Sequence, residues 1–291
     1  MPVSKDLSWS LVEKYRRKTF RFLPKYHLKT REDAVQFVNE RGFVFFWPIS
    51  GFDVPSLWSA VAGDRPVPNQ HDDPAHITWR WKDDLLGESV WFYAKVLRQK
   101  STMISLDLLP YFYALSPNYG EPEQDYLIAY QDGKLTLEEK QVYETILENG
   151  PLDSIMLRNE SRLSSKENNA RFSRALNFLM RDFRILPVGV AEAGTWNYAF
   201  VYDAVHRHFP GLPERAREIY ESEARRKILE SYFFSVGASQ IQIVRKLFQW
   251  PERLVERTLD SMQESEVLVN QVKFKGKEGE WWLLSSLASS K

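Results

Sequence analysis

One stretch of this 291-residue chain combines side chains that bind nucleic acid with the spacing of a single helix face. On a 3.6-residue wheel, one side of the segment 164–183 is polar and two arginines flank it. These residues are Lys166, Asn169, Ser173, Asn177 and Arg181, with Arg171 and Arg174 beside them. Asn and Arg can read the edges of adenine and guanine, and Lys and Ser can bind phosphate oxygens. The pattern predicts a DNA-contacting helix, although a solvated surface helix would carry the same polar face.

Two further segments are basic. Lys14, Arg16, Arg17 and Lys18 open a run that contains no acidic residue before Arg31. Aromatic residues are interleaved in this run, so it could follow a phosphate backbone. Its long side chains could equally cover the acidic stretch 121–148. Near the C-terminus, a predicted hairpin carries three lysines in and beside its turn that could hold a DNA backbone, namely Lys273, Lys275 and Lys277.

Side chains for catalysis or metal binding do not fall at the spacing of known sites. The candidates are His71 with His76, His206 with His208, and the neighbours Asp83 and Asp84. The chain has no cysteine, which excludes disulfides and thiolate sites. It also lacks a phosphate-binding glycine loop, a nucleophile-elbow serine and a dinucleotide fingerprint. We therefore expect no metal and no cofactor.

The elements that position these residues form a unit that recurs. Residues 138–202 read as a helical pair, a polar-faced third helix and two aromatic strands; 225–284 repeat this order, and 30–106 hold a looser version. Capping boxes are predicted at Thr30-Arg-Glu-Asp33 and Ser164-Ser-Lys-Glu167, and a helix over 79–98. The predicted fold class is mainly α with small β-hairpins, arranged as tandem winged-helix units, each a helix-turn-helix followed by a wing.

These patterns divide the chain into successive parts. The predicted parts are a basic N-terminal arm at 1–29, a first winged-helix-like domain at 30–118, an acidic linker at 119–135, a second winged-helix domain at 136–212 and a third at 213–291. The 39 basic and 39 acidic residues cancel, which argues against a protein that coats nucleic acid non-specifically. The N-terminus resembles no signal peptide and no run is apolar enough to span a bilayer, so we expect a cytoplasmic protein without membrane contact.

The order of several short motifs resembles the AlkZ-like (YcaQ) family of bacterial winged-helix DNA glycosylases. The motifs are Gly42-Phe-Val, Pro48-Ile-Ser50, Val54-Pro55-Ser-Leu-Trp58, Arg174-Ala-Leu-Asn-Phe-Leu179, Phe200-Val-Tyr202-Asp203, and the helical unit from Pro213 through Ile228-Leu-Glu to Gly237. The similarity extends over most of residues 30–285. It implies three tandem winged helices that form a concave DNA-binding surface, with excision of alkylated bases in the active members.

The resemblance also implies a departure at the catalytic positions. Active members carry Gln-x-Gln or Gln-x-Asp shortly after the Gly-aromatic-Val motif, where these side chains position the attacking water. Aligned on Gly42, this chain has Phe45 and Trp47 at those positions, and neither can orient a water. The sequence also ends at Lys291, directly after the last wing, without the β-rich domain that follows in family members.

Three hypotheses follow. The leading one is a non-catalytic winged-helix protein that binds duplex or damaged DNA through the basic arm, the 166–181 helix and the Lys273–Lys277 wing. An alternative is a protein-protein interaction scaffold, which the zero net charge and the acidic Glu192 near a wing tip favour. A further alternative is a diverged DNA glycosylase, hydrolysing N-glycosidic bonds, with Trp47, Trp58 or Tyr113 for base stacking and Asp53 as a base. Nothing in the sequence predicts the oligomeric state.

Overall fold

The computed structural model describes residues 7–70, 72–118, 120–194 and 198–289. Two compact units divide the chain, one formed by residues 1–78 with 222–291 and the other by 79–221. We call them the first and the second unit. The boundary at residue 78 falls inside the range 30–118 that we predicted as one domain, and the three-domain division stays a prediction.

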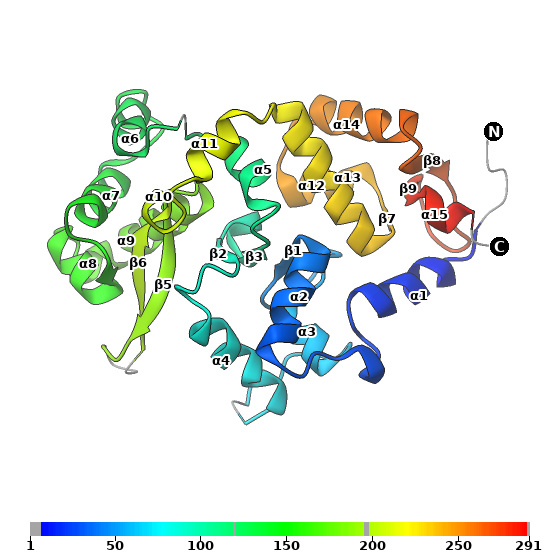
Figure 1. Ribbon diagram of the computed structural model, residues 1–291, viewed down its shortest axis with the longest axis horizontal. Coiled ribbons are helices and arrows are strands. Elements are labelled where there is room, and N and C mark those ends of the chain that lie inside the picture. The colour runs from blue at the N-terminus through cyan, green and yellow to red at the C-terminus, as the bar shows by residue number, and fades with distance from the viewer. Residues whose placement is uncertain (1–6, 71, 119, 195–197, 290–291) are drawn as a thin grey trace. The chain divides into compact units, whose positions relative to one another are not determined.

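The second unit contains the clearest copy of the predicted motif (Figure 1). Its elements are β2 (Phe92–Lys95), η3 (Leu97–Gln99), β3 (Ser101–Ile104), α5 (Leu109–Ala114), α6 (Pro122–Gln131), α7 (Leu137–Asn149), β4 (Leu152–Asp153), α8 (Ser154–Glu160), η4 (Lys166–Asn168), α9 (Asn169–Arg181), β5 (Ile185–Ala191), β6 (Ala199–Ala204), α10 (Val205–His208) and α11 (Leu212–Arg217). Strands β4, β6 and β5 form an antiparallel sheet with β6 in the middle. Helices α7, α8 and α9 precede the β5–β6 hairpin, as predicted for residues 138–202.

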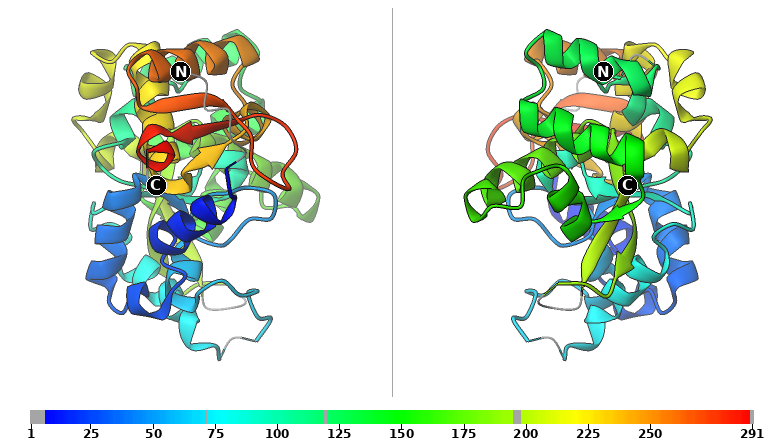
Figure 2. Two further views of the ribbon diagram at one scale, coloured as in Figure 1. Left: turned by 90° about the vertical axis from the view of Figure 1, so that its right-hand side faces the viewer. Right: turned by 90° about the vertical axis from the view of Figure 1, so that its left-hand side faces the viewer.

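The first unit repeats the order of three helices and a hairpin (Figure 2). Its elements are α1 (Ser10–Thr19), η1 (Pro24–Tyr26), α2 (Arg31–Arg41), β1 (Phe43–Phe45), α3 (Leu57–Ala62), η2 (Pro74–His76), α4 (Ile77–Asp84, which runs into the second unit), α12 (Glu221–Val236), β7 (Ala238–Ser239), α13 (Ile241–Phe248), α14 (Glu252–Glu264), β8 (Leu268–Val272), β9 (Trp281–Leu284) and α15 (Ser285–Ala288). Strand β9 lies between β7 and β8, just as β6 lies between β4 and β5. The repeat of strand order supports the repeat predicted over 225–284.

Apolar periodicity explains why α9 and α14 take their places. In α9, Phe172, Ala175 and Leu179 are buried on one face, and α14 buries Val255, Leu259 and Met262 in the same way. Burial of such a stripe stabilises a helix far more than its intrinsic propensity does. The polar sides of both helices are consequently left facing the solvent.

Three local predictions were wrong in part. The helix predicted over 79–98 is replaced by α4 and β2, and Gly87 turns the chain between them with φ +85°. A Cβ at Gly87 would lie 2.7 Å from the Val188 carbonyl oxygen, so this close approach requires glycine. The acidic range 119–135 contains α6, because Pro122 can start a helix and the acids of its first turn complement the helix dipole.

The capping box predicted at Ser164 is not formed. A 3-10 turn, η4, precedes α9, and Ser165 at the start of η4 makes no side-chain cap. The guanidinium of Arg158 donates instead to the carbonyl oxygens of Leu163 at 2.9 Å and Ser165 at 2.7 Å. Residues 195–197, which include Thr195 and Trp196 of the predicted hairpin, lie outside the described residues.

The capping box predicted at Thr30 is confirmed and gives a stability test. Asp33 donates its N–H to the Thr30 hydroxyl at 3.1 Å, and its carboxylate accepts from the Thr30 N–H at 3.1 Å. Thr30→Ala should lower the free energy of unfolding by about 1 kcal/mol, because one N–H of α2 loses its acceptor. Urea unfolding followed by circular dichroism measures this loss. Ser164→Ala, which removes no cap, is the matched control, and an equal loss in both variants would contradict the prediction.

Candidate nucleic-acid interface

The 3-10 turn η4 and helix α9 together present the predicted polar face to solvent. Lys166, Asn169, Ser173 and Arg174 are exposed, and Asn177 is half-buried. Within the described part of the chain, no carboxylate pairs with Lys166 or Arg174. Arg171, by contrast, pairs with Glu138 of α7 at 3.3 Å. Two cations, Lys166 in η4 and Arg174 in α9, are therefore available to an external anion.

Arg181 at the end of α9 is placed differently. Its guanidinium pairs with Asp182 at 2.8 Å and lies 4.3 Å from the ring centroid of Phe178. Cation–π contact and ion pairing hold the side chain along its own helix. The accessible part of the predicted face therefore extends from Lys166 to Arg174. Arg181 is held by contacts within its own helix end and is less accessible.

In the first unit, α1 and the β8–β9 hairpin lie next to each other (Figure 2). Leu7 pairs with the hairpin, since its N–H donates to Lys273 O and its carbonyl accepts from Lys275 N–H, both at 2.9 Å. Trp9 then packs against Phe274 and Trp281 with ring centroids 5.1 and 4.8 Å away. Two basic segments that we predicted separately are therefore joined in one unit.

The side chains of this combined basic region point both inward and outward. Lys14, Arg17, Lys18, Lys273, Lys275 and Lys277 are exposed. Arg16 is turned toward the protein, where it donates to the carbonyl oxygens of Val236 at 2.9 Å and Ala238 at 3.0 Å. Arg16 also pairs with Asp53 at 3.1 Å, so a residue predicted for DNA and a candidate base are partners of each other. Their predicted roles stay predictions.

The two family motif positions lie in apolar surroundings. Phe45 is fully buried, and its N–H donates to Pro55 O at 2.9 Å. Trp47 is half-buried and packs edge-on against Phe46 with ring centroids 4.7 Å apart. Of the other stacking candidates, Trp58 is fully buried and Tyr113 is 3% exposed. All four side chains contribute to hydrophobic packing.

An unpredicted polar cluster lies between α4 and β6 of the second unit. The amine of Lys82 pairs with Asp83 at 2.5 Å and donates to the Tyr198 hydroxyl at 2.9 Å, while that hydroxyl donates to Asp83 at 2.9 Å. The rings of Phe200, Tyr93 and Tyr198 surround the ammonium at 4.5, 5.5 and 5.6 Å. Burial lowers the pKa of Lys82, and Asp83 opposes the shift. We call this group the Lys82 cluster.

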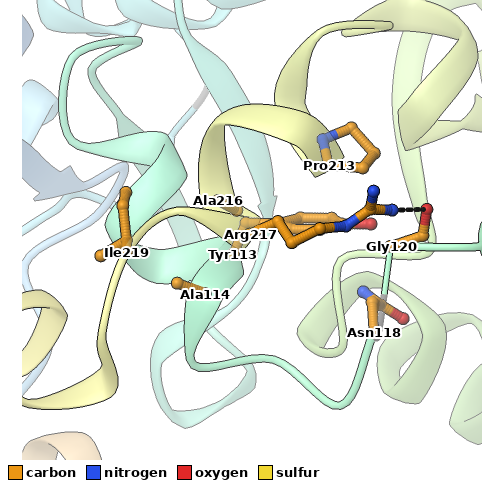
Figure 3. Close-up of a pocket in the computed structure, with 8 residues that line it drawn as sticks. All are labelled: Tyr113, Ala114, Asn118, Gly120, Pro213, Ala216, Arg217 and Ile219. Carbon is orange, nitrogen blue, oxygen red and sulfur yellow. Dashed lines mark hydrogen bonds between the residues drawn. The ribbon is translucent and has the colours of Figure 1, made fainter.

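A small cavity of about 190 Å³ lies beside the C-terminal end of α9 (Figure 3). Its lining residues are Tyr113, Ala114, Asn118, Gly120, Pro213, Ala216, Arg217 and Ile219. Asn118 donates to Asp182 O at 2.7 Å, and Arg217 donates to Gly120 O at 3.1 Å. The cavity is smaller than the roughly 300 Å³ at which small-molecule sites begin, and we assign it no ligand.

The structure does not gather metal ligands from the residues it describes. His206 and His208 are half-buried, and His208 Nε2 lies 3.0 Å from Ser89 Oγ. Asp84 pairs with Arg80 at 3.6 Å. Over the described ranges, no three His, Asp or Glu side chains converge as metal ligands would, and His71 lies outside those ranges. None of the described helices is both long enough and apolar enough to cross a bilayer.

Buried tyrosines should make the folded state less stable at high pH. Burial raises the pKa of Tyr93 to about 12 and raises the pKa values of Tyr143, Tyr202 and Tyr232 as well. Because these folded pKa values exceed the unfolded value of about 10, the folded state holds the protons more tightly. The stabilisation is fully present below about pH 10 and is lost as the pH rises toward the folded values. Absorbance at 295 nm should therefore rise together with loss of helical circular dichroism.

All thirteen tyrosines should ionise near pH 10 once the chain is unfolded in guanidinium, which provides the control. Full ionisation near pH 10 with the helical signal retained would contradict the assigned burial.

The fold defines a class of protein: mainly helical, with small antiparallel sheets that close groups of helices, as the sequence predicted. The family model described as "AlkZ related" matches residues 28–249, and the chain therefore belongs to the AlkZ-related family. Among solved structures, Streptomyces sahachiroi DNA glycosylase AlkZ matches with a TM-score of 0.62 and 13% identity, covering 99% of this chain and 73% of that one. At this identity the likeness shows the fold. No curated protein matches the sequence.

Proposed function

We propose that this protein is a non-catalytic winged-helix protein of DNA repair that binds duplex or damaged DNA. The observation that carries the proposal is the polar face of η4 and α9, where Lys166 and Arg174 are exposed and have no carboxylate partner among the described residues. Asn169 and Ser173 lie beside them on α9. A third helix followed by a hairpin is the arrangement through which winged helices meet DNA. The exposed lysines and arginines of α1 and the β8–β9 hairpin supply a second basic region.

The proposed loss of catalysis rests on Phe45 and Trp47. Their rings pack among other aromatic side chains, at positions where the family resemblance implies amide or carboxylate groups. Asp53, the alternative base, is engaged by Arg16 at 3.1 Å. Base release from alkylated DNA that disappears in Asp53→Asn would instead support a diverged glycosylase.

Salt-dependent DNA binding tests the proposal. Fluorescence anisotropy with labelled duplex, single-stranded and abasic-site DNA should show affinity that falls steeply with salt, because bound phosphates release counterions. Lys166→Ala with Arg174→Ala should reduce the slope of log K against log salt by about 2, one for each lost phosphate contact.

Arg171→Ala is the matched control, since this arginine of the same helix already pairs with Glu138. Its slope should stay close to that of the unchanged protein. Absence of binding at low salt, or equal losses in both variants, would refute the role of α9.

A second candidate function is a protein-protein scaffold, and α6 is the observation that favours it. Leu127, Ile128 and Tyr130 are 39%, 50% and 37% exposed, and Leu137 at the start of α7 is 51% exposed. Grouped exposed apolar side chains are typical of interaction sites. A stable complex that Ile128→Glu disrupts, in a protein without DNA affinity, would select this function.

A further inference from the structure

The Lys82 cluster has the composition of a reactive amine site. A lysine side chain that is 1% exposed contacts a carboxylate and a phenol that also bond to each other. Desolvated lysines next to a proton acceptor can act as nucleophiles toward carbonyl carbon.

We propose that Lys82 captures the aldehyde of an abasic site in DNA as an imine. The inference rests on the proposed DNA-binding function and adds a covalent substrate class to it. The open-chain sugar of an abasic site has an aldehyde carbon at C1′, the kind of carbonyl with which amines form Schiff bases.

The position of the cluster links it to the DNA-contacting elements of the second unit. Tyr198 directly precedes β6, in the hairpin that follows α9. Its side chain is 41% exposed and that of Asp83 is 24% exposed. Both groups that contact the Lys82 amine therefore reach the surface. The proposal requires the Tyr198 ring to rotate so that the sugar reaches Nζ while the hydroxyl stays within hydrogen-bond distance of Asp83.

The cluster also provides the proton transfers. The Lys82 ammonium passes one proton to Asp83, and the neutral Nζ forms a bond to C1′ while the carbonyl π pair moves to oxygen. Tyr198, reprotonated by Asp83, protonates this oxygen, and transfer of a second amine proton lets it leave as water. The Nζ–C1′ double bond remains, so one aldehyde and one amine become one imine and one water. Lowering of the Lys82 pKa by burial favours the neutral amine.

Reductive trapping tests the proposal with the unchanged protein. A labelled duplex with one abasic site is incubated with the protein and cyanoborohydride, which reduces an imine to a stable amine. We expect a covalent complex on a denaturing gel, no complex with the intact duplex, and a peptide adduct at Lys82 by mass spectrometry. An abasic duplex that binds in anisotropy but gives no adduct, or an adduct at other lysines only, would overturn the proposal.

Variants separate chemistry from stability. Lys82→Arg keeps a cation in the cluster but cannot form the imine, so trapping should be lost while abasic-site binding remains. Tyr198→Phe should slow trapping by about 10-fold or more and alter its pH profile, because the proton relay is broken. Lys140→Arg is the matched control: Lys140 also pairs with a carboxylate, Glu144 at 2.7 Å, and lies over Tyr130. Trapping by Lys82→Arg at the unchanged rate would exclude Lys82.

A free sugar phosphate tests the reactivity of Lys82 separately from DNA binding. If anisotropy shows no DNA affinity, the proposed function fails, and the same reduction with 2-deoxyribose 5-phosphate tests the amine alone. Preferential labelling of Lys82 would support the reactive amine, whereas labelling spread over the exposed lysines would overturn it.

Discussion

Lys82→Ala is expected to lower the free energy of unfolding by about 3 kcal/mol, at the lower end of the range for breaking a buried ion pair. The substitution removes the ammonium that lies 2.5 Å from the Asp83 carboxylate. It also removes the cation–π contact with Phe200, whose ring centroid lies 4.5 Å from that ammonium. Asp83 is 24% exposed, so water compensates part of the loss. Urea unfolding measures the change, and hydrogen exchange should show the weakening in peptides of α4 and β6.

Lys140→Ala is the control for this experiment. Lys140 and Glu144 are 23% and 30% exposed, and such a pair contributes about 0–1 kcal/mol. Equal losses of unfolding free energy in the two variants would show that the Lys82 cluster stabilises the fold no more than an ordinary surface ion pair.

Phe183→Ala should lower the free energy of unfolding by about 3–5 kcal/mol through the cavity it leaves. Phe183 is 4% exposed, and its ring stacks on Phe92 with centroids 5.0 Å apart. Phe112 and Tyr113 lie at 6.4 and 6.2 Å, so one side chain fills the centre of an aromatic group. Thermal or urea unfolding measures the loss.

The backbone at Phe183 gives this prediction a second test. Its φ is +56°, a left-handed conformation that disfavours side chains with a Cβ. Phe183→Gly should therefore be no less stable than Phe183→Ala, although glycine normally destabilises. Phe234→Ala is the control, since that side chain is 50% exposed and should change stability by about 1 kcal/mol or less. A markedly less stable glycine variant would contradict the prediction.

Local patterns were enough to predict several elements. Thr30 and Asp33 cap α2 as expected because a capping box involves only residues three apart. The 3.6-residue spacing of Phe172, Ala175 and Leu179 identified the buried side of α9, and therefore its exposed side. Helix α6 was missed because proline, glycine and acidic residues also mark loops, and only their position in a first turn distinguishes the two.

The sequence alone determined the class of fold, the repeat of helices and hairpin, the family and the residues that α9 presents to solvent. Each depends on spacing over a few residues or on a motif order that is readable along the chain. Only the tertiary structure decided which distant side chains meet. Lys82 and Tyr198 are 116 positions apart, and Arg16 and Val236 are 220 apart. Such contacts arise from packing of whole elements, and no local periodicity encodes them. Arg16 therefore binds carbonyl oxygens inside its unit, and a lysine without any sequence signal lies beside a carboxylate and a phenol.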